Sequence, residues 1–537
     1  MREIFFGREK ISTLNAIFFH VALIAMSFAF VYVFSYSTSF GYDLLGGDSA
    51  VFQVVGKYWL EGVLPYKEIF DHKGPIVYVI NAIGYAIYPR SGIMVPQIIC
   101  LYVSLLFLWR ITEILKFGRA KILVFALTIL YYVAHYHAGN YATEYNMPFL
   151  MAAVYIFLRD LNAPRVQVLH GFIYGFGFGA SVLLRTTNAM PLCCCAFLSA
   201  IFLLKSGDLK NLWQNFLSFC SGFLVIVLPF VIYFVAHGAL YDMLYGTILF
   251  NMKYIGVPAP EYSFLYKFLF VSVHAMPMIF MTVASLGEIL QGRTNKLIVS
   301  GLFIGVIMII LQAKMRPYPH YYMTTVPLIP MFVAICSEFV TNSRPLFNKI
   351  KLNLKRLWRI KTFSFKRLAC KFFFVTVSFY FAICAHFYFS HPDFIWAFSP
   401  SAVRAADEIA ERELKEVTEL KKIIPENERD SFVCWGDHNT TTHWIIYADM
   451  KPRERLFMNN AFLIKVDRDL WIEWFNNVTS NPPLWILYGT RPDRKIGELP
   501  RLPHELPEIE QFLADKYSLR GQVKLSDQMM KLYRLKE

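Results

Sequence analysis

Long apolar stretches separated by short polar or basic segments fill the first 390 residues of the chain. Eleven of them are long enough to cross about 30 Å of hydrocarbon as a helix, even the shortest at about 17 residues. They occupy residues 14–36, 92–114, 120–137, 145–161, 168–185, 188–205, 214–236, 264–287, 297–313, 321–340 and 371–390. The pattern predicts a mainly α, polytopic membrane domain over residues 1–390.

A twelfth apolar stretch, residues 75–89, decides the topology of everything after it. If it does not cross, the basic residues between the spans all fall on the side of the N-terminus, as one inside face requires. These residues are Arg2, Arg8, Lys10, Lys116, Arg119, Lys121, Arg159, Arg165, Lys205, Lys210, Arg293, Lys296 and ten more from Arg344 to Lys371. If it does cross, all of these residues except Arg2, Arg8 and Lys10 fall on the outside. We therefore expect residues 75–89, with proline at each end, to form a juxtamembrane or re-entrant helix.

The opposite, outer face then collects rare ionisable residues at the ends of spans. It holds the loop 37–91, residues 137–144, Arg185, the loop 237–263, residues 314–320 and everything after 391. Charged residues that converge at one side of a membrane domain indicate a functional site. The most informative is Asp48, in Gly46-Gly47-Asp48-Ser49, because it follows the first span and begins the amphipathic stretch 50–63. A carboxylate there favours an enzyme working at the membrane surface over a pore or a simple carrier.

After residue 390 the chain becomes polar, and a second domain is predicted over residues 391–537. Residues 401–423 are helical and rich in charge, and β-like runs follow at 431–436, 444–447 and 484–488, with a last strand near 530–534. Helical stretches at 467–476 and 508–516 lie between them. Strands that alternate with helices predict a small α/β domain. Gly436-Asp437-His438 follows a strand, where a turn is the simpler interpretation than a site loop.

Composition agrees with a membrane protein and narrows its partners. Hydrophobic residues make up 56% of the chain, the mean hydropathy is +0.41 and there are 50 phenylalanines. The net charge of +14 comes largely with the block from Arg344 to Lys371, between two apolar spans, so it indicates topology and anionic lipid and argues against a nucleic-acid partner. Cys434 is the only cysteine of the polar region, so no disulfide is expected there. The first span is too long for a cleavable signal peptide and is expected to be a signal anchor.

The order of these elements resembles the GT-C membrane glycosyltransferases, and within them the family 39-like enzymes, which include the protein mannosyltransferases and the lipid A aminoarabinose transferase. The resemblance covers roughly residues 1–390 and lies in Asp48-Ser49-Ala50-Val51-Phe52, Leu64-Pro65-Tyr66 and Asp71-His72-Lys73-Gly74-Pro75. Thr143-Glu144, Arg185 and His320-Tyr321-Tyr322 follow in the family's order. The chain departs from the pattern at Ser49, where many members carry a second acid, and at Gly74, where many have proline. Ser49 weakens the inference of a family-type metal site.

The resemblance implies a polyprenyl-phosphate-sugar donor, an acceptor on the outer side and inversion at the anomeric carbon. It implies Asp48 as the catalytic base, and Arg185, Lys73 and Arg316 as the residues that face the lipid phosphate. His320 and Tyr321 belong to the substrate site, as does Glu144. Asp71 orients Lys73, contacts the acceptor or forms a local ion pair. No metal ligands are assigned; a divalent cation near Asp48, His72, Glu144 and His320 is left open.

Two other hypotheses remain beside the glycosyltransferase. A flippase or transporter for a lipid-linked glycan would place charge at the middle of the bilayer, and a sensor or assembly protein would work through its outer domain. The acceptor, whether lipid, glycan or protein, is not readable from the sequence. The scarcity of outer cysteines favours a bacterial inner membrane, with the N-terminus cytoplasmic and the C-terminal domain periplasmic; lipopolysaccharide is one candidate acceptor.

Overall fold

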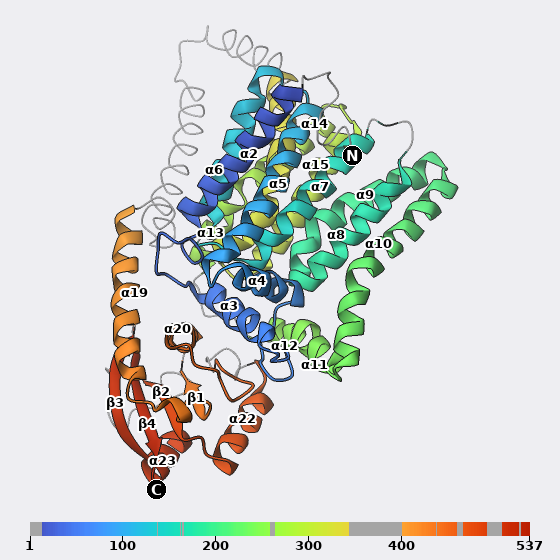
Figure 1. Ribbon diagram of the computed structural model, residues 1–537. Helices are drawn as coiled ribbons and strands as arrows, with labels where there is room; N and C mark the ends of the chain where they lie inside the picture. The colour runs from blue at the N-terminus through green and yellow to red at the C-terminus, as the bar shows by residue number, and fades with distance from the viewer. Residues whose placement is uncertain are drawn as a thin grey trace, which may run out of the picture.

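The computed structural model of the protein describes residues 13–136, 138–161, 163, 166–257, 264–342, 400–436, 438–458, 466–490, 507–525 and 528–537. A bundle of long helices forms one part of the molecule and a small α/β domain forms the other (Figure 1). The bundle contains α2 (Thr13–Phe34), α5 (Met94–Ile114), α6 (Lys121–Tyr136), α7 (Ala142–Leu161), α8 (Val168–Arg185), α9 (Met190–Ser206), α10 (Leu209–Ala236), α13 (Phe264–His274), α14 (Met276–Leu290), α15 (Lys296–Lys314) and the 3-10 segment η5 (Pro319–Leu328).

The bundle identifies the protein as a multi-pass integral membrane protein. Within the described residues, seven helical stretches are long and apolar enough to cross a membrane, or up to eight if the bent pair α13 and α14 is one span. One of the seven, Val168–Ser206, contains both α8 and α9, which the chain separates at Arg185 by an extended backbone. The predicted count of eleven spans is therefore not confirmed. The span 371–390, the basic block from Arg344 and the domain boundary at 390 lie outside the described residues.

One predicted span is interrupted. Residues 264–287 were expected to form a single helix, but the chain bends by 71° between α13 and α14. The break falls at Ala275, and Pro277 lies in the first turn of α14. Proline has no N–H to donate and its ring excludes the preceding turn, so it begins a helix readily and does not continue one.

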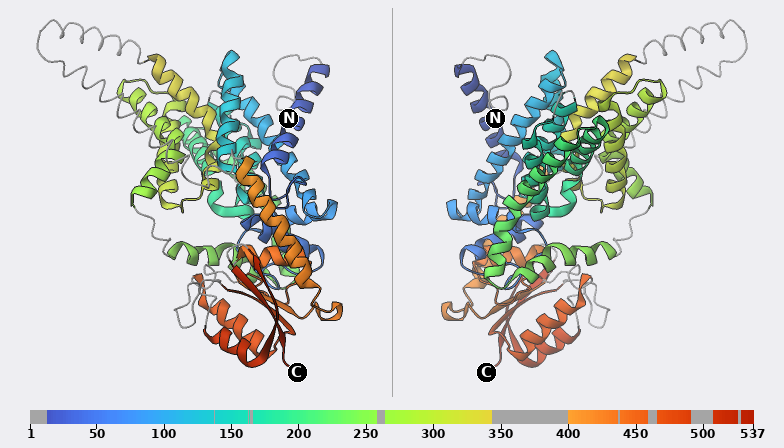
Figure 2. Two further views of the ribbon diagram at one scale, coloured as in Figure 1. Left: turned by 90° about the vertical axis from the view of Figure 1, so that its left-hand side faces the viewer. Right: turned by 90° about the vertical axis from the view of Figure 1, so that its right-hand side faces the viewer.

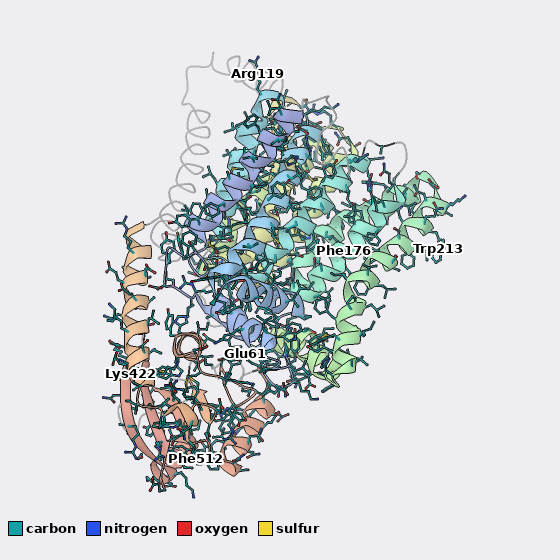
Figure 3. The ribbon with its side chains drawn as sticks, viewed as in Figure 1. Glu61, Arg119, Phe176, Trp213, Lys422 and Phe512 are labelled. Carbon is teal, nitrogen blue, oxygen red and sulfur yellow. The ribbon has the colours of Figure 1, made fainter. Side chains whose placement is uncertain are left out.

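Short helices form a layer at one end of the bundle, next to the α/β domain. The layer contains α3 (Gly47–Leu60), α4 (Pro75–Ile87), α11 (Leu240–Leu244), the π-helical turn η4 (Tyr245–Leu249) and α12 (Phe250–Gly256). With 13 residues, α4 is about 20 Å long and shorter than the hydrocarbon core. Figure 3 shows Glu61, just after α3, near the α/β domain and Arg119 at the opposite end of the bundle. The basic segment around Arg119 and the outer loops thus lie at opposite ends.

The C-terminal domain is a four-stranded mixed sheet with helices. The strands β1 (Phe432–Trp435), β2 (Trp485–Thr490), β3 (Tyr517–Leu525) and β4 (Gln528–Leu535) pair in the order β1-β2-β4-β3, with β1 and β2 parallel and the others antiparallel. The helices are α19 (Pro400–Lys421), α20 (His438–Ala448), α22 (Arg468–Ser480) and α23 (Pro507–Lys516). Residues 444–447, expected to form a strand, belong to α20 instead. Asp437 lies outside the described residues.

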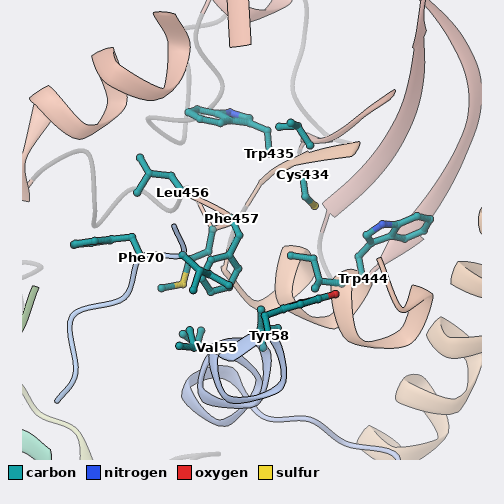
Figure 4. Close-up of a cluster of buried hydrophobic side chains, with 14 of the residues drawn as sticks. Val55, Tyr58, Phe70, Cys434, Trp435, Trp444, Leu456 and Phe457 are labelled. Carbon is teal, nitrogen blue, oxygen red and sulfur yellow. The ribbon is translucent and has the colours of Figure 1, made fainter. Parts of the chain in front are cut away.

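A single cluster of buried side chains joins the C-terminal domain to the layer of short helices. Figure 4 shows Val55 and Tyr58 of α3 and Phe70 of the following loop close to Leu456 and Phe457 of the C-terminal domain. The same cluster continues to Trp435 and Trp444. The two side views show the bundle, the short helices and the α/β domain as successive layers (Figure 2). The C-terminal domain is therefore packed against the end of the bundle that carries the short helices.

Candidate functional site

A cavity of about 1000 Å³ lies at the end of the bundle that carries the short helices. It is lined by side chains from the outer loop, the end of α8, α12, the segment after α15 and one residue of the C-terminal domain. Seven of the eight site residues predicted from the sequence line this cavity: Asp48, Asp71, Lys73, Arg185, Arg316, His320 and Tyr321. Predicted residues up to 273 positions apart in the chain, Asp48 and Tyr321, thus line one cavity.

Asp48 lies in the first turn of α3, where the helix begins against the cavity. Gly46 precedes the helix with φ of 68°, a left-handed conformation that glycine adopts without a steric cost. The N-terminal turn of a helix favours a negative side chain. The neighbouring Ser49 is buried away from the cavity, and its hydroxyl accepts hydrogen bonds from Gln53 (3.0 Å) and Asn140 (2.8 Å). The position where relatives of the resembled family carry a second acid is therefore occupied here by a buried structural contact.

The segment Asp71-His72-Lys73-Gly74 is pressed against the C-terminal end of α8. The Gly74 amide donates to the Leu184 carbonyl at 3.1 Å. A β-carbon at Gly74 would lie 2.0 Å from the Leu183 carbonyl oxygen, so no larger residue fits without movement of the backbone. This close approach places Lys73 beside Arg185, the last residue of α8. It also explains why glycine stands where a proline was expected from the resemblance, since proline has neither the space nor the N–H.

Within this segment, His72 links the carboxylate of Asp71 to the ammonium of Lys73. Lys73 Nζ lies 2.8 Å from His72 Nε2, and His72 Nδ1 lies 3.0 Å from Asp71 Oδ1. Burial and the charge of Lys73 lower the pKa of His72, so the ring is neutral at pH 7 and its Nε2 accepts from Lys73, while Nδ1 lies close to Asp71 without the geometry of a hydrogen bond. No direct ion pair joins Asp71 to Lys73 in the described structure, and His72 lies between the two side chains.

Asp71 is a buried anion held by its neighbours. Burial opposes its charge, but His72, Lys73 and the Tyr78 hydroxyl, which donates to Oδ2 at 2.7 Å, outweigh burial and hold the pKa of Asp71 below its usual range. The Tyr78 oxygen also accepts from the Lys73 amide at 3.1 Å. This fixed anion positions the loop rather than offering a group that exchanges protons near pH 7.

Two arginines supply uncompensated positive charge to the cavity. The Arg185 guanidinium lies 3.7 Å from the ring centre of Tyr321, and that of Arg316 lies 4.2 Å from the ring centre of Tyr254. Such stacking holds a guanidinium in place and leaves its edge for other partners. Neither guanidinium forms an ion pair within the described part of the chain. Together with Lys73 and Lys314 they make the cavity suited to an anionic group.

His320 is held between two tyrosine rings on the same wall. Its ring stacks on Tyr141 at 4.5 Å and on Tyr318 at 5.8 Å, with interplanar angles of 12° and 11°. The two stacked rings hold the plane of the imidazole in place. His320 thus lines the cavity, as expected for a residue of the substrate site.

Glu144 is the predicted site residue that does not line the cavity. It is buried behind the turn 138–140, where its carboxylate accepts from the amide of Asn140 at 2.8 Å and from Gln97 at 3.1 Å. Ala138, Gly139 and Asn140 all have positive φ, which needs support from hydrogen bonds. Glu144 thus stabilises the turn that brings Tyr141 into the cavity, and the expectation of direct substrate contact is not met by this geometry.

Sequence reasoning left several cavity residues unassigned. Among the residues that the structure describes, no cluster of three or more His, Cys, Asp or Glu is suited to a metal ion. Lys314, Tyr141 and Tyr254 occur in segments that the charge pattern had placed at the outer end, so their region was predictable. Met458 comes from the C-terminal domain, and no signal in the sequence places it here.

Comparison with known proteins gives a family and a fold. The family model described as putative competence-induced protein Ccs4 N-terminal domain matches residues 10–395. A crystal structure of ArnT from Cupriavidus metallidurans in the apo state is similar over 97% of this chain and 98% of that one, with a TM-score of 0.52 and 11% identity. At this level of identity the similarity shows a shared fold, so the chain has an ArnT-like fold. No curated protein matches the sequence.

Proposed function

We propose that this chain, which belongs to the family described as putative competence-induced protein Ccs4 N-terminal domain, is a membrane glycosyltransferase of the GT-C type. The proposal is that it moves a sugar from a polyprenyl-phosphate-linked donor to an extracytoplasmic lipid, glycan or protein acceptor, with inversion. One observation carries it: Asp48 shares a cavity at the outer end of the bundle with Arg185 and Arg316, which form no ion pairs in the described structure. The similarity of fold to ArnT supports it.

The donor is held by its charge and its lipid. Its phosphate lies against Arg185, Arg316 and Lys73, whose combined charge also stabilises the phosphate as it departs with an additional negative charge. The polyprenyl chain extends between the membrane-spanning helices. The sugar is then directed toward the wall that carries Asp48.

Transfer proceeds in one displacement. Asp48 accepts the proton of the acceptor hydroxyl while the hydroxyl oxygen forms a bond to the anomeric carbon. The bond between that carbon and the phosphate oxygen breaks, and its electron pair leaves on the lipid phosphate. Because the oxygen attacks opposite the departing phosphate, the configuration inverts. No metal is required for the balance of this step, and a divalent cation remains a question for assay.

The charge pattern supports an orientation. The basic segment around Arg119 lies at the end of the bundle away from the C-terminal domain, and the positive-inside rule puts such segments in the cytoplasm. The cavity and the C-terminal domain are then extracytoplasmic, and we propose a bacterial inner membrane with a periplasmic C-terminal domain.

The test is sugar transfer by the purified chain from a panel of radiolabelled polyprenyl-phosphate sugars to a membrane-lipid extract. Asp48→Asn keeps the shape of the side chain and removes the base, so turnover should fall by about 10²- to 10⁴-fold. Asp43→Asn is the matched control, because Asp43 lies five positions earlier, outside the cavity lining and half exposed. The proposal is supported if the wild type and Asp43→Asn transfer sugar and Asp48→Asn does not.

Two results would contradict it. Near-full turnover by Asp48→Asn would remove Asp48 as the base. Movement of a labelled lipid-linked glycan across vesicles without any new glycosidic bond would replace the transferase by a flippase.

A further inference from the structure

Arg455 is one of the residues through which the C-terminal domain contacts the loop 66–70. Arg455 lies in the segment between α20 and α22, and its Nε donates to the Tyr66 carbonyl at 2.8 Å. Its own backbone carbonyl accepts from the Phe70 amide at 2.9 Å. Its guanidinium lies 5.2 Å from the centre of the Phe70 ring. Arg455 therefore forms hydrogen bonds with both ends of the turn 66–70, through its side chain at Tyr66 and through its backbone at Phe70.

That turn needs support. Tyr66 has φ of 70°, an unfavourable conformation for a residue with a β-carbon, and its amide donates to the Ile69 carbonyl at 2.7 Å. The Tyr66 side chain is fully buried. A charge-assisted hydrogen bond to its carbonyl is among the stronger ways to hold such a residue in place.

Tyr66 connects the turn to the cavity through its side chain. Its hydroxyl donates to the Lys73 carbonyl at 2.7 Å. The Lys73 amide in turn donates to Tyr78, whose hydroxyl holds Asp71. A continuous path of hydrogen bonds thus runs from Arg455, through Tyr66, to the backbone of Lys73 and the Asp71-His72-Lys73 segment.

Arg455 also ties this path to two other elements. Its guanidinium lies 3.6 Å from Asp242 of α11 and 3.6 Å from Glu473 of α22. Arg455 therefore joins the outer loop, the layer of short helices and the C-terminal domain at one point. It does not line the cavity itself.

We propose that Arg455 is a positioning residue for the transfer reaction, which holds Lys73 in register with the donor phosphate through Tyr66. The inference rests on the proposed function and gives the C-terminal domain a part in it: the domain completes the site rather than standing apart from it. Small displacements of a group that binds the reacting phosphate reduce the rate steeply, up to about 10²-fold for about 1 Å.

The experiment uses the full chain in lipid nanodiscs with two measurements, hydrogen exchange of residues 66–74 and the kinetics of sugar transfer. Arg455→Gln should raise exchange in 66–74 and lower kcat by about 10- to 100-fold, with a smaller change in KM. Arg455→Lys keeps one donor for Tyr66 and should recover part of the loss. Arg453→Gln is the matched control, because its side chain has a similar exposure, 24% against 20%, and lies beside Glu454.

A double variant separates this path from general damage. Tyr66→Phe removes only the bond to the Lys73 carbonyl, so Arg455→Gln should cost little further kcat in the Tyr66→Phe background. Wild-type exchange in residues 66–74 of Arg455→Gln, or a kcat equal to that of Arg453→Gln, overturns the inference. If the wild type transfers no sugar, the proposed function fails and the exchange measurement still decides whether Arg455 positions the loop.

Discussion

Gly74 shows how one residue decides the geometry of the cavity. The 2.0 Å between its notional β-carbon and the Leu183 oxygen leaves no room for any side chain. We expect Gly74→Ala to lower stability by about 1 to 3 kcal/mol through overpacking and to reduce sugar transfer by moving Lys73 away from Arg185. Gly74→Pro should be worse, since it also removes the donor to Leu184. Stability is measured by thermal unfolding and sugar transfer by the turnover number. A Gly74→Ala variant with wild-type values of stability and turnover would contradict the close contact.

His72 makes a prediction about pH. Its pKa is lowered in the folded protein by burial and by Lys73, so below about pH 6.5 the unfolded chain takes up a proton that the folded chain does not. Stability should therefore fall as the pH decreases from about 6.5, and this loss should be smaller in His72→Gln. The measurement is the unfolding temperature of both proteins between pH 7.5 and pH 5. Parallel curves for the two would show that His72 does not titrate in this way.

At the residue scale, the sequence predicted which side chains meet but not how they are used. Lys73, Arg185 and Arg316 could be grouped because each lies at the end of an apolar stretch, and Asp48 because it begins the amphipathic stretch after the first span. The charge asymmetry of the loops then predicts one common end for them. The position of Glu144 could not be predicted, because a carboxylate in the first turn of a helix has the same sequence pattern whether it faces a cavity or a buried turn. The stacking of Arg185 on Tyr321 depends on side-chain conformation, which no periodicity reports.

Among the elements, α8 and α10 make the closest contact described in the bundle. Gly171, Gly175 and Gly222 lie where β-carbons would be 2.3, 1.9 and 2.2 Å from carbonyl oxygens of the facing helix. Small residues spaced by four allow such approach in membrane helices. We expect Gly175→Val to separate α8 from α10 and to lower the unfolding temperature in detergent, whereas Gly256→Val, with open space around it, should not. Equal effects of the two substitutions would point to a general cost of valine.

The elements that were predicted correctly are those with a strong pattern. The helices at 401–423 and 508–516 and the strands near 432, 485 and 530 follow from charge, from length and from short runs of aromatic and aliphatic residues. Residues 444–447 were predicted as a strand but continue α20, which begins six residues earlier. A short apolar run has the same appearance in a strand and in a buried helical turn, so the sequence could not distinguish them. The bend at Ala275 was missed because hydropathy is blind to a break inside an apolar stretch.

For the whole molecule, the shared hydrophobic cluster predicts that the outer helices and the C-terminal domain unfold together. The buried Tyr58 hydroxyl donates to the Met450 carbonyl at 2.6 Å, and Tyr58→Phe should cost about 1 to 3 kcal/mol by leaving that carbonyl without its donor. Thiol labelling during heating should become easier at Cys434 and at Cys100 by the same shift, because both pack on this cluster. Tyr241→Phe, at a residue 70% exposed, should shift neither. A shift at Cys434 alone would indicate two independent units.

Met458 brings one side chain of the C-terminal domain into the wall of the cavity. Any molecule that fills the cavity therefore contacts a segment that is distant in the sequence from the outer loop and from α8. The C-terminal domain and the membrane helices should therefore evolve together. If the segment around Met458 is exchanged between relatives, we expect the acceptor preference to follow this segment and the donor preference to follow the membrane helices.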